Sequence, residues 1–569
     1  MAENRAAGGS SGDSLDAVAV IVAKFGVGNR RLREALAMLA ERRQTVESLV
    51  RASALPRRTV ESLLQAADRD LDKNAGGAVI RADRAAAYRD RFALDRLRRS
   101  QVADPHDAQL AAHGALVAQA GADIAAAPAA RDALDHVAAT AETVVRRALW
   151  LDATFDLAGS RLLCIGDHDL SSLAMCAVAP EVAVTVVDLD DQLLEFIEGR
   201  AVRRGYNIEC WYADLRFGIP RIAAESAGIV LTDPPYTPEG VRLFLGRGAQ
   251  GLRDRANGRL VMAYGFSPLH PALGMKVQRA VQDLDLVTEA ILPAFNRYHG
   301  AQAVGSASDL YVLRPTARTF QILDKKLAGA TVNIYTRGTQ SVEARPGTLD
   351  PGVAGAVIRL ATGSENATPS LLAGAGWPAV PDGTTACDLA SLFGSGVPAP
   401  AGRRAPLQVA VNLAGDPGPW LLRALLAVNA DHLVVLVPDN HPALASRAPQ
   451  RVLTTLIAPK YSLRLRRSTP ASGHAVIDAT AVTAGHGAQA VAHDLLCRAH
   501  GKVGNVWREA LIRCSAEVLG EPLTRNEARS LIAGAVARQA WLDARLVDLP
   551  QHAIRALLGA AEASAATLA

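Results

Sequence analysis

Aspartates stand directly after several apolar runs of the sequence that have the pattern of buried β-strands. The segments are GDHDL at 166–170, DLD at 188–190, Asp214, and DPPY at 233–236. The carboxyl ends of parallel strands form the ligand-binding edge of an open α/β sheet. We therefore expect these carboxylates to line one rim, where they would attract a positively charged ligand.

The DPPY segment has the residue types needed to hold an amine. Proline lacks an amide proton and keeps the preceding residue out of the α region, so Asp233 is expected to end the strand at 229–231. Its carboxylate, the rigid Pro234 and Pro235, and the ring of Tyr236 could bind an amino group beside an electrophile. The same tetrapeptide is typical of enzymes that methylate amino groups with S-adenosylmethionine; the alternative is a plain strand-ending turn.

The other segments suit a nucleoside. Gly166 lets the backbone approach a ligand closely, Asp188 and Asp190 after the second strand can accept hydrogen bonds from ribose hydroxyls, and Asp214 can accept from an adenine amino group. Taken singly, each acid could instead be a helix N-cap. The ordered set predicts a nucleoside site.

The charge of the loop at 166–170 indicates which class of nucleoside the site would bind. No GxGxxG is present, and Asp167 and Asp169 would repel a pyrophosphate. A dinucleotide is therefore disfavoured, and a sulfonium nucleoside is favoured.

Composition sets further limits. The chain has 569 residues and a net charge of +4, so no strong field demands a nucleic-acid or membrane partner. Its six cysteines form no Cys-x-x-Cys pair, which disfavours a zinc ribbon or a disulfide framework and fits a reducing cytoplasm. The absence of a signal-peptide pattern and of membrane-length apolar stretches predicts a soluble, cytoplasmic protein.

The pattern changes along the chain suggest a multidomain α/β protein. Strand candidates in the central part alternate with helices, which predicts a parallel, doubly wound, Rossmann-like sheet; they are 162–165, 182–187, 208–212, 229–231, 260–262, 287–292 and 310–313. We expect these divisions: a disordered tail (1–13), a winged-helix-like domain (14–80), a helical connector (81–150), the catalytic domain (151–316), an unassigned stretch (317–344), a linker with loops (345–406), a degenerate second α/β lobe (407–485) and C-terminal helices (486–569).

Two helical features have more than one interpretation. The segment 45–64 has the pattern of a helix-turn-helix with Arg57 and Arg58 at the start of its second helix, where a DNA reader would place them. Basic charge is not sustained around it, so dimerisation or a lid role is favoured over nucleic-acid binding. Glu142, near another helix start, could compensate the helix dipole or project into the ligand cleft.

A longer set of segments resembles a known family. The stretches 134–150 (LDHVAATAETVVRRALW), 162–174 (LLCIGDHDLSSLA), 186–198, 213–220, 231–248 and 294–299 (AFNRYH) resemble bis(aminopropyl)spermidine synthase, the branched-chain polyamine synthase family, over about 134–314. The resemblance implies a Rossmann-like, class I methyltransferase-type domain behind a winged-helix-like domain. It also implies aminopropyl transfer from decarboxylated S-adenosylmethionine to a polyamine such as spermidine, releasing methylthioadenosine, without a permanently bound cofactor.

The resemblance also assigns roles. The segment 166–170 becomes the acidic motif beside the reacting amine, and Asp233 faces the acceptor. Asp169 or Asp233 would accept the amine proton. Asp188, Asp190 and Asp214 fall where the family holds the nucleoside.

Two departures from the family pattern keep alternatives open. His168 stands where the family motif has its middle acid, and Tyr236 stands where the family has an acid after the prolines. A neutral His168 could act as the base instead. Both changes remove negative charge, so the acceptor could be less cationic than spermidine, or the donor could be S-adenosylmethionine in an N-methyltransferase. A DNA-binding regulator with an inactive catalytic domain is the third alternative.

The C-terminal third has no complete ligand set in its sequence. The lobe at 407–485 and the helices at 486–569 are therefore expected to serve structure or dimerisation, and a homodimer is the expected assembly.

Overall fold

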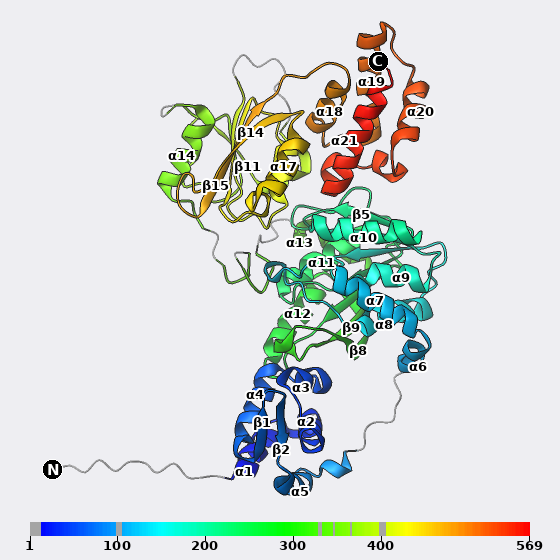
Figure 1. Ribbon diagram of the computed structural model, residues 1–569, viewed down its shortest axis with the longest axis vertical. Helices are drawn as coiled ribbons and strands as arrows, with labels where there is room; N and C mark the ends of the chain where they lie inside the picture. The colour runs from blue at the N-terminus through cyan, green and yellow to red at the C-terminus, as the bar shows by residue number, and fades with distance from the viewer. Residues whose placement is uncertain are drawn as a thin grey trace, which may run out of the picture.

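The computed structural model describes residues 13–97, 105–327, 333–338, 340–344, 347–364, 367–397 and 406–568. The expected disordered tail lies outside the described residues except for Asp13, which caps the first helix. Figure 1 shows an N-terminal helical domain, a central sheet domain and a second sheet domain in a row, with the C-terminal helices beside the second sheet.

The N-terminal domain joins helices to a short antiparallel hairpin around its own hydrophobic core. Thr45 caps the third helix through the amide of Ser48 at 3.0 Å, as its position before an apolar face predicts. The elements are α1 (Ser14–Lys24), α2 (Arg30–Glu41), α3 (Val46–Ser53), α4 (Arg57–Ala66), β1 (Leu71–Asn74), β2 (Gly77–Ile80) and α5 (Ala82–Arg91).

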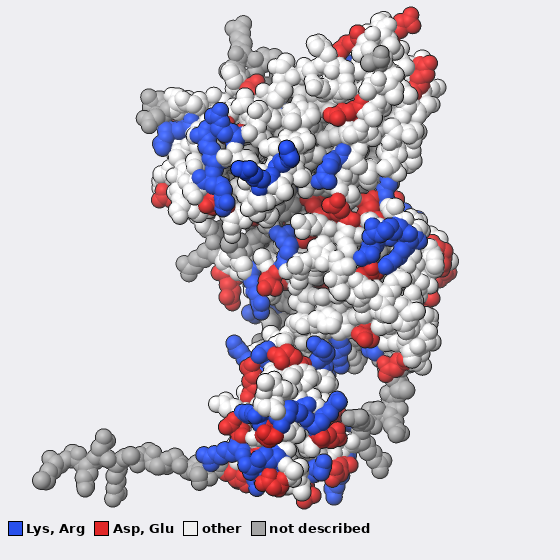
Figure 2. All heavy atoms as spheres, in the orientation of Figure 1, with Lys and Arg blue, Asp and Glu red and all other residues white. Residues whose placement is uncertain are grey.

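The helix-turn-helix turn faces the central domain. Arg57 Nη1 donates to Gln302 Oε1 at 2.5 Å, and Arg57 also pairs with Glu47 and Glu61. A Cβ atom at Gly305 would lie 2.4 Å from the carbonyl oxygen of Ala54, so the two segments are in close contact there. Basic and acidic side chains alternate over the visible face of this domain (Figure 2). Arg57 is therefore occupied within the protein.

The expected connector at 81–150 is divided between two domains. Tyr88 and Phe92 extend the N-terminal core, because α5 has apolar residues on the face that meets α2. The later helices pack on the central sheet domain instead. They are α6 (Pro105–Ala112), α7 (Gly114–Ala126) and α8 (Ala141–Thr154).

The central sheet has the order β5-β4-β3-β6-β7-β9-β8. Its first five strands are parallel, as the strand–helix alternation predicts. The exception is β9, which runs antiparallel to both of its neighbours, β7 and β8, and follows β8 after only a short 3₁₀ turn (Gln302–Val304). The strands are β3 (Arg161–Ile165), β4 (Ala183–Asp188), β5 (Ile208–Tyr212), β6 (Ile229–Thr232), β7 (Arg259–Tyr264), β8 (Leu286–Arg297) and β9 (Ala307–Pro315).

Helices cover both faces of this sheet, so its central strands are buried on both sides. The stretch left unassigned at 317–344 begins with a helix that packs on α11. The helices are α9 (Ser171–Val178), α10 (Asp191–Arg204), α11 (Pro238–Gly251), α12 (Pro271–Asp283) and α13 (Ala317–Leu327).

A second sheet has the order β11-β10-β12-β13-β15-β14. The expectation of a linker over 345–406 is wrong, because helices and strands in this stretch belong to the second sheet domain. Glycine- and proline-rich loops around the three-residue strands β10 and β11 hide that pattern. The elements are α14 (Pro351–Thr362), β10 (Leu371–Ala373), β11 (Thr385–Cys387), α15 (Leu389–Ser395), β12 (Gln408–Asn412), α16 (Trp420–Ala427), β13 (His432–Pro438), α17 (Arg447–Ile457), β14 (Tyr461–Arg466) and β15 (His474–Ala481).

The C-terminal helices pack on one another and on α10 of the central domain. Thr524 and Glu527 form the predicted capping box. The helices are α18 (Ala488–Cys497), α19 (Val503–Leu519), α20 (Arg525–Ala535) and α21 (Gln551–Ala566). Among the described helices, none has the length and apolar character needed to cross a bilayer.

Candidate active site

The acidic segments follow adjacent strands of the central sheet. Because the order is β5-β4-β3-β6, the positions of Asp214, Asp188, Asp167 and Asp233 succeed one another along the carboxyl edge. The sequence therefore places these residues on one rim, as expected from the topology of a doubly wound sheet. Their side-chain contacts differ from one acid to the next.

Asp167 turns inward to cap a helix. Its carboxylate accepts hydrogen bonds from the amide of Ser172 at 3.2 and 3.3 Å, at the start of α9. Burial, and then the nearby Asp169, raise the pKa of Asp167 well above its usual value. Gly166 precedes it with φ +71°, a conformation that glycine adopts readily.

Asp188 receives backbone hydrogen bonds from its own loop and from the loop after β3. Its Oδ1 accepts from the amide of Asp190 at 2.8 Å and its Oδ2 from the amide of Asp167 at 3.2 Å. Burial raises the pKa of Asp188 to about 6. Asp190 caps α10 through the amides of Gln192 and Leu193, so the simpler N-cap interpretation holds for its Oδ1.

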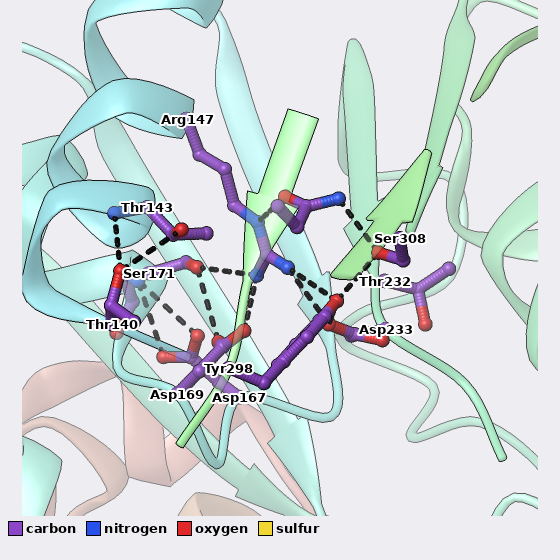
Figure 3. A network of polar contacts seen from close by, with 12 residues as sticks. Thr140, Thr143, Arg147, Asp167, Asp169, Ser171, Thr232, Asp233, Tyr298 and Ser308 are labelled. Carbon is purple, nitrogen blue, oxygen red and sulfur yellow. Dashed lines mark hydrogen bonds and ion pairs between the residues drawn. The ribbon is translucent and has the colours of Figure 1, made fainter. Parts of the chain in front are cut away.

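A buried arginine joins two of the acids (Figure 3). Arg147 comes from α8 and is 2% exposed. Its Nη1 forms an ion pair with Asp169, its Nη2 lies 2.8 Å from Asp233 Oδ2, and its Nε donates to Asn296 Oδ1 at 2.7 Å. The guanidinium therefore neutralises part of the charge of the acidic rim.

Tyrosine hydroxyls complete the surroundings of Asp233. The hydroxyl of Tyr298, on the segment after β8, donates to Asp233 Oδ2 at 2.7 Å, and that of Tyr236 donates to Tyr298 at 3.1 Å. Burial raises the pKa of Asp233, although Arg147 and the Tyr298 hydrogen bond act in the opposite direction. Asp233 thus combines a fixed orientation with a raised pKa, which suits proton transfer.

Contacts of the following residue, Thr237, also fix the DPPY loop. Pro234 and Pro235 are buried, and Thr237 caps α11 through the amide of Gly240 at 2.9 Å. The Thr237 hydroxyl also donates to the carbonyl of Ile334 at 2.6 Å. The segment 333–338 therefore lies against this loop.

His168 stacks on a second histidine. The ring centroids of His168 and His136 are 4.3 Å apart with 19° between the planes. Burial lowers the pKa of both rings, that of His136 to about 4, and His136 further lowers the pKa of His168. The pair is therefore neutral at pH 7.

Asp214 does not present a free carboxylate. Its Oδ1 accepts from Arg216 Nε at 2.8 Å and its Oδ2 from Trp420 Nε1, on α16 of the second sheet domain, at 2.8 Å. Burial would raise the pKa of Asp214, but Arg216 lowers it below the usual value. Side chains of the protein therefore fill the hydrogen-bonding positions that the predicted contact with an adenine amino group would use.

Glu142 is exposed on the first turn of α8, and the network around Arg147 is built without it. A helix-dipole role fits this position. Among the described residues, no group of His, Cys, Asp and Glu is arranged to hold a metal ion.

Sequence reasoning missed Arg147, Asn296, Tyr298, His136 and Trp420. A signal for Arg147 exists: it lies on the apolar face of α8 with Val144, Ala148 and Leu151, all buried. A cation on a buried helix face requires an anionic partner. The contact of Trp420 joins segments 206 residues apart and leaves no local signal.

Comparisons with known proteins find similarity over the central sheet domain. Residues 119–321 match the family model described as branched-chain polyamine synthase A C-terminal domain. An uncharacterized protein of Methanocaldococcus jannaschii is 34% identical over 205 residues, 36% of this chain and 49% of that protein. The N(4)-bis(aminopropyl)spermidine synthase of Thermococcus kodakarensis is 37% identical over 120 residues, 21% of this chain and 34% of the enzyme.

One similar solved structure is the branched-chain polyamine synthase of Thermus thermophilus in complex with N4-aminopropylspermidine and 5′-methylthioadenosine. It aligns with a TM-score of 0.38 and 21% identity, over 53% of this chain and 92% of that one. The chain spans about half the length, or less, of the curated relatives it matches. Residues 119–321 of the chain are therefore similar to the branched-chain polyamine synthase family.

Proposed function

We propose that the protein is an aminopropyltransferase, which moves an aminopropyl group from decarboxylated S-adenosylmethionine to an amine of a polyamine or a related acceptor and releases methylthioadenosine. The names of its sequence relatives support this reaction. The observation that carries the proposal is the row of carboxylates on adjacent strand ends, with Asp233 and Asp169 fixed by Arg147.

In this reaction the acceptor nitrogen attacks the carbon next to the sulfonium sulfur. The C–N bond forms, the C–S bond breaks, and its electron pair goes to sulfur, which leaves as a neutral thioether. The nitrogen loses a proton, and Asp233 is the proposed acceptor because its pKa is raised and its orientation is fixed by Tyr298. The sulfonium carbon is already electrophilic, so alignment is the larger task.

The residues around Asp233 have separate proposed roles. Arg147 and Tyr298 orient its carboxylate, while Pro234, Pro235 and Tyr236 shape the acceptor side. His168, neutral on its stack with His136, is a second candidate base.

At the donor end, Gly166 and Asp188 are proposed to contact the nucleoside. Asp188 can accept from the ribose hydroxyls when it is ionised. Asp190 and Asp167 position the surrounding loops through helix capping. Asp214 reaches an adenine amino group only if its present partners change.

The charge of the acceptor side favours a substrate with fewer positive charges than spermidine. Arg147 offsets one carboxylate charge, and His168 and Tyr236 are uncharged where the family motif has acids. A long polycation therefore has fewer anionic partners at this site than the acidic sequence suggests.

N-methylation from S-adenosylmethionine is the second candidate, because Tyr236 completes the DPPY tetrapeptide of amino-group methyltransferases. The regulator alternative loses support, since Arg57 is engaged with Gln302.

Mass spectrometry of products separates these reactions. The full-length protein is incubated with either donor and a panel of monoamines, diamines and triamines. A mass gain of one aminopropyl group supports the proposal, and a gain of one methyl group supports the second candidate. Unchanged amines with both donors would contradict both.

A further inference from the structure

We propose that Trp420 of the second sheet domain occupies the position on Asp214 that the adenine amino group of the donor needs, so that the protein closes its own nucleoside site. This inference rests on the proposed function and extends it to a domain outside the matched family region. Figure 1 shows the second sheet domain and the C-terminal helices above the end of the central domain that carries β5 and α10, and Asp214 follows β5 in the chain.

The carboxylate of Asp214 has no acceptor position to spare. A carboxylate offers about four lone-pair sites. Oδ1 accepts from the Arg216 amide at 3.0 Å and from Arg216 Nε at 2.8 Å, whereas Oδ2 accepts from Arg216 Nη2 and from Trp420 Nε1. Asp214 is 5% exposed. An adenine amino group can bond to it only after one of these donors leaves.

The indole is the partner that can leave. Arg216 lies two residues from Asp214 in the same loop, and its Nη1 is held by Gln340 Oε1 at 2.7 Å. Trp420 comes from another domain, and only its single N–H joins it to the carboxylate. Both the indole and a purine are flat aromatic bicycles that present an N–H donor. They would therefore compete for the same binding position beside the Asp214 carboxylate.

Aromatic and cationic side chains surround the indole of Trp420 at this binding position. The ring centroid of Trp420 lies 5.2 Å from that of Phe217, in an edge-on arrangement, and 4.9 Å from the Arg216 guanidinium. Phe393 of α15 closes the cluster at 5.0 Å from Phe217. Trp420 is 2% exposed and fills the space.

The turn that carries Trp420 is held firmly within its own domain. Asp416 accepts from the amides of Gly418 at 2.7 Å and Trp420 at 3.0 Å, and His441 Nε2 lies 3.0 Å from its Oδ2. His441 Nδ1 accepts from the amide of Ala443, so Nε2 carries the proton that is donated to Asp416. The turn therefore has to move as a unit.

Further contacts hold the same turn close to Asp190 and Asp214, the acids on the nucleoside side of the rim. Arg131 donates to the carbonyl of Pro417 and lies 3.6 Å from Asp190 Oδ2. Gln340 links Arg216 to the carbonyl of Gly415. Donor binding at Asp214 must break this closed arrangement, which lowers the apparent affinity for the nucleoside.

Calorimetric titration of the full chain with 5′-methylthioadenosine tests the inference. Trp420→Phe removes the indole N–H and keeps an aromatic ring, so we expect its affinity to exceed that of the wild type by about tenfold, the usual effect of a hydrogen bond to a charged group. Gln340→Ala, which removes the contact with the Gly415 carbonyl and also releases Arg216 Nη1, should also bind more tightly. The matched control is Trp377→Phe, which removes an indole N–H bonded to the Ala373 carbonyl within the second sheet domain and should bind like the wild type.

Acrylamide quenching gives a readout that is independent of turnover. The quenching of Trp420, taken as wild type minus Trp420→Phe, should rise when the nucleoside is added. Equal or weaker binding by Trp420→Phe, or quenching that does not change on binding, would overturn the inference while leaving the aminopropyl reaction intact. Tighter binding by the variant without any product from either donor would instead retain this inference and remove the proposed reaction. Failure of all the proteins to bind would overturn both.

Discussion

Arg147 Nη2 lies 2.8 Å from Asp233 Oδ2, so the carboxylate of the DPPY loop already has a cationic partner within the protein. The same guanidinium pairs with Asp169 from the first acidic loop. One buried cation therefore sets the distance and orientation between two loops of the rim. It also reduces the negative charge that an incoming amine meets.

Replacing Asp233 by Asn should lower turnover by about 10²–10⁴-fold and leave nucleoside binding within about threefold of the wild type, since this residue lies on the acceptor side of the rim. The amide cannot accept the amine proton, and loss of a general base lowers rates by about 10²–10⁴-fold. Single-turnover kinetics and calorimetry measure the two effects. Asp152→Asn, an exposed position on α8, is the control and should behave as the wild type. Turnover at the wild-type rate in Asp233→Asn would exclude Asp233 from proton transfer.

Replacing Arg147 by Met should destabilise the protein by about 3–5 kcal/mol, because the buried Asp169 and the half-buried Asp233 lose their common partner. Urea unfolding followed by far-UV circular dichroism measures the loss. The double variant Arg147→Met/Asp233→Asn should recover part of it, since one uncompensated charge is gone. Additive losses in the double variant would show that the pairing with Asp233 contributes nothing.

Nucleoside binding should strengthen as pH rises from 5 to 7. Burial raises the pKa of Asp188 to about 6, so this carboxyl group is protonated below that pH and ionised above it. Only the ionised form accepts from both ribose hydroxyls, and each pH unit below 6 should weaken binding by up to about tenfold. Titrations with methylthioadenosine at several pH values test this. The Asp188→Asn variant should bind weakly at every pH; a wild-type profile without a step near pH 6 would contradict the assignment.

The buried Lys460 predicts a second pH effect, on stability. Burial lowers the pKa of Lys460 to about 7, although its Nζ donates to the carbonyls of Leu426 and Leu496 at the ends of two helices. Between pH 7 and 10.5 the unfolded chain keeps this proton and the folded chain does not. Stability due to this residue therefore rises with pH in that window and is constant below it.

The comparison that isolates this effect is with Lys460→Met. Relative to that variant, the wild type should gain about 1.4 kcal/mol of unfolding free energy per pH unit from 7 to 9. Urea titrations at pH 6, 7, 8 and 9 measure the difference, which is independent of any constant loss from the missing hydrogen bonds. Parallel curves for the two proteins would show that Lys460 remains charged in the folded state.

The elements of the central sheet were largely predictable from sequence. Short apolar runs bounded by aspartates and helical stretches specify strands such as β3 and β6, and the order of the acids specifies the rim. The antiparallel direction of β9 was not predicted, because an apolar run does not reveal which way a strand enters the sheet. The elements within 345–406 were hidden for a different reason: β10 and β11 are three residues each and lie among glycines and prolines.

The site was predictable only in part. Local order placed Asp188 and Asp233 on the rim, but the state of each acid depends on partners far away in the chain. Arg147 pairs with Asp233 across 86 residues, and Trp420 bonds to Asp214 across 206. No periodicity encodes such pairs, so the sequence did not indicate that Arg216 and Trp420 fill the acceptor positions of Asp214.

The N-terminal domain keeps a hydrophobic cluster that shares none of its described residues with the clusters around the two sheets, whereas one cluster runs from the central sheet through Trp420 into the second. Cooperative melting follows continuous packing. Scanning calorimetry should therefore resolve a separate heat-absorption peak for the N-terminal domain. The central and second sheet domains should unfold together in a single, broader peak.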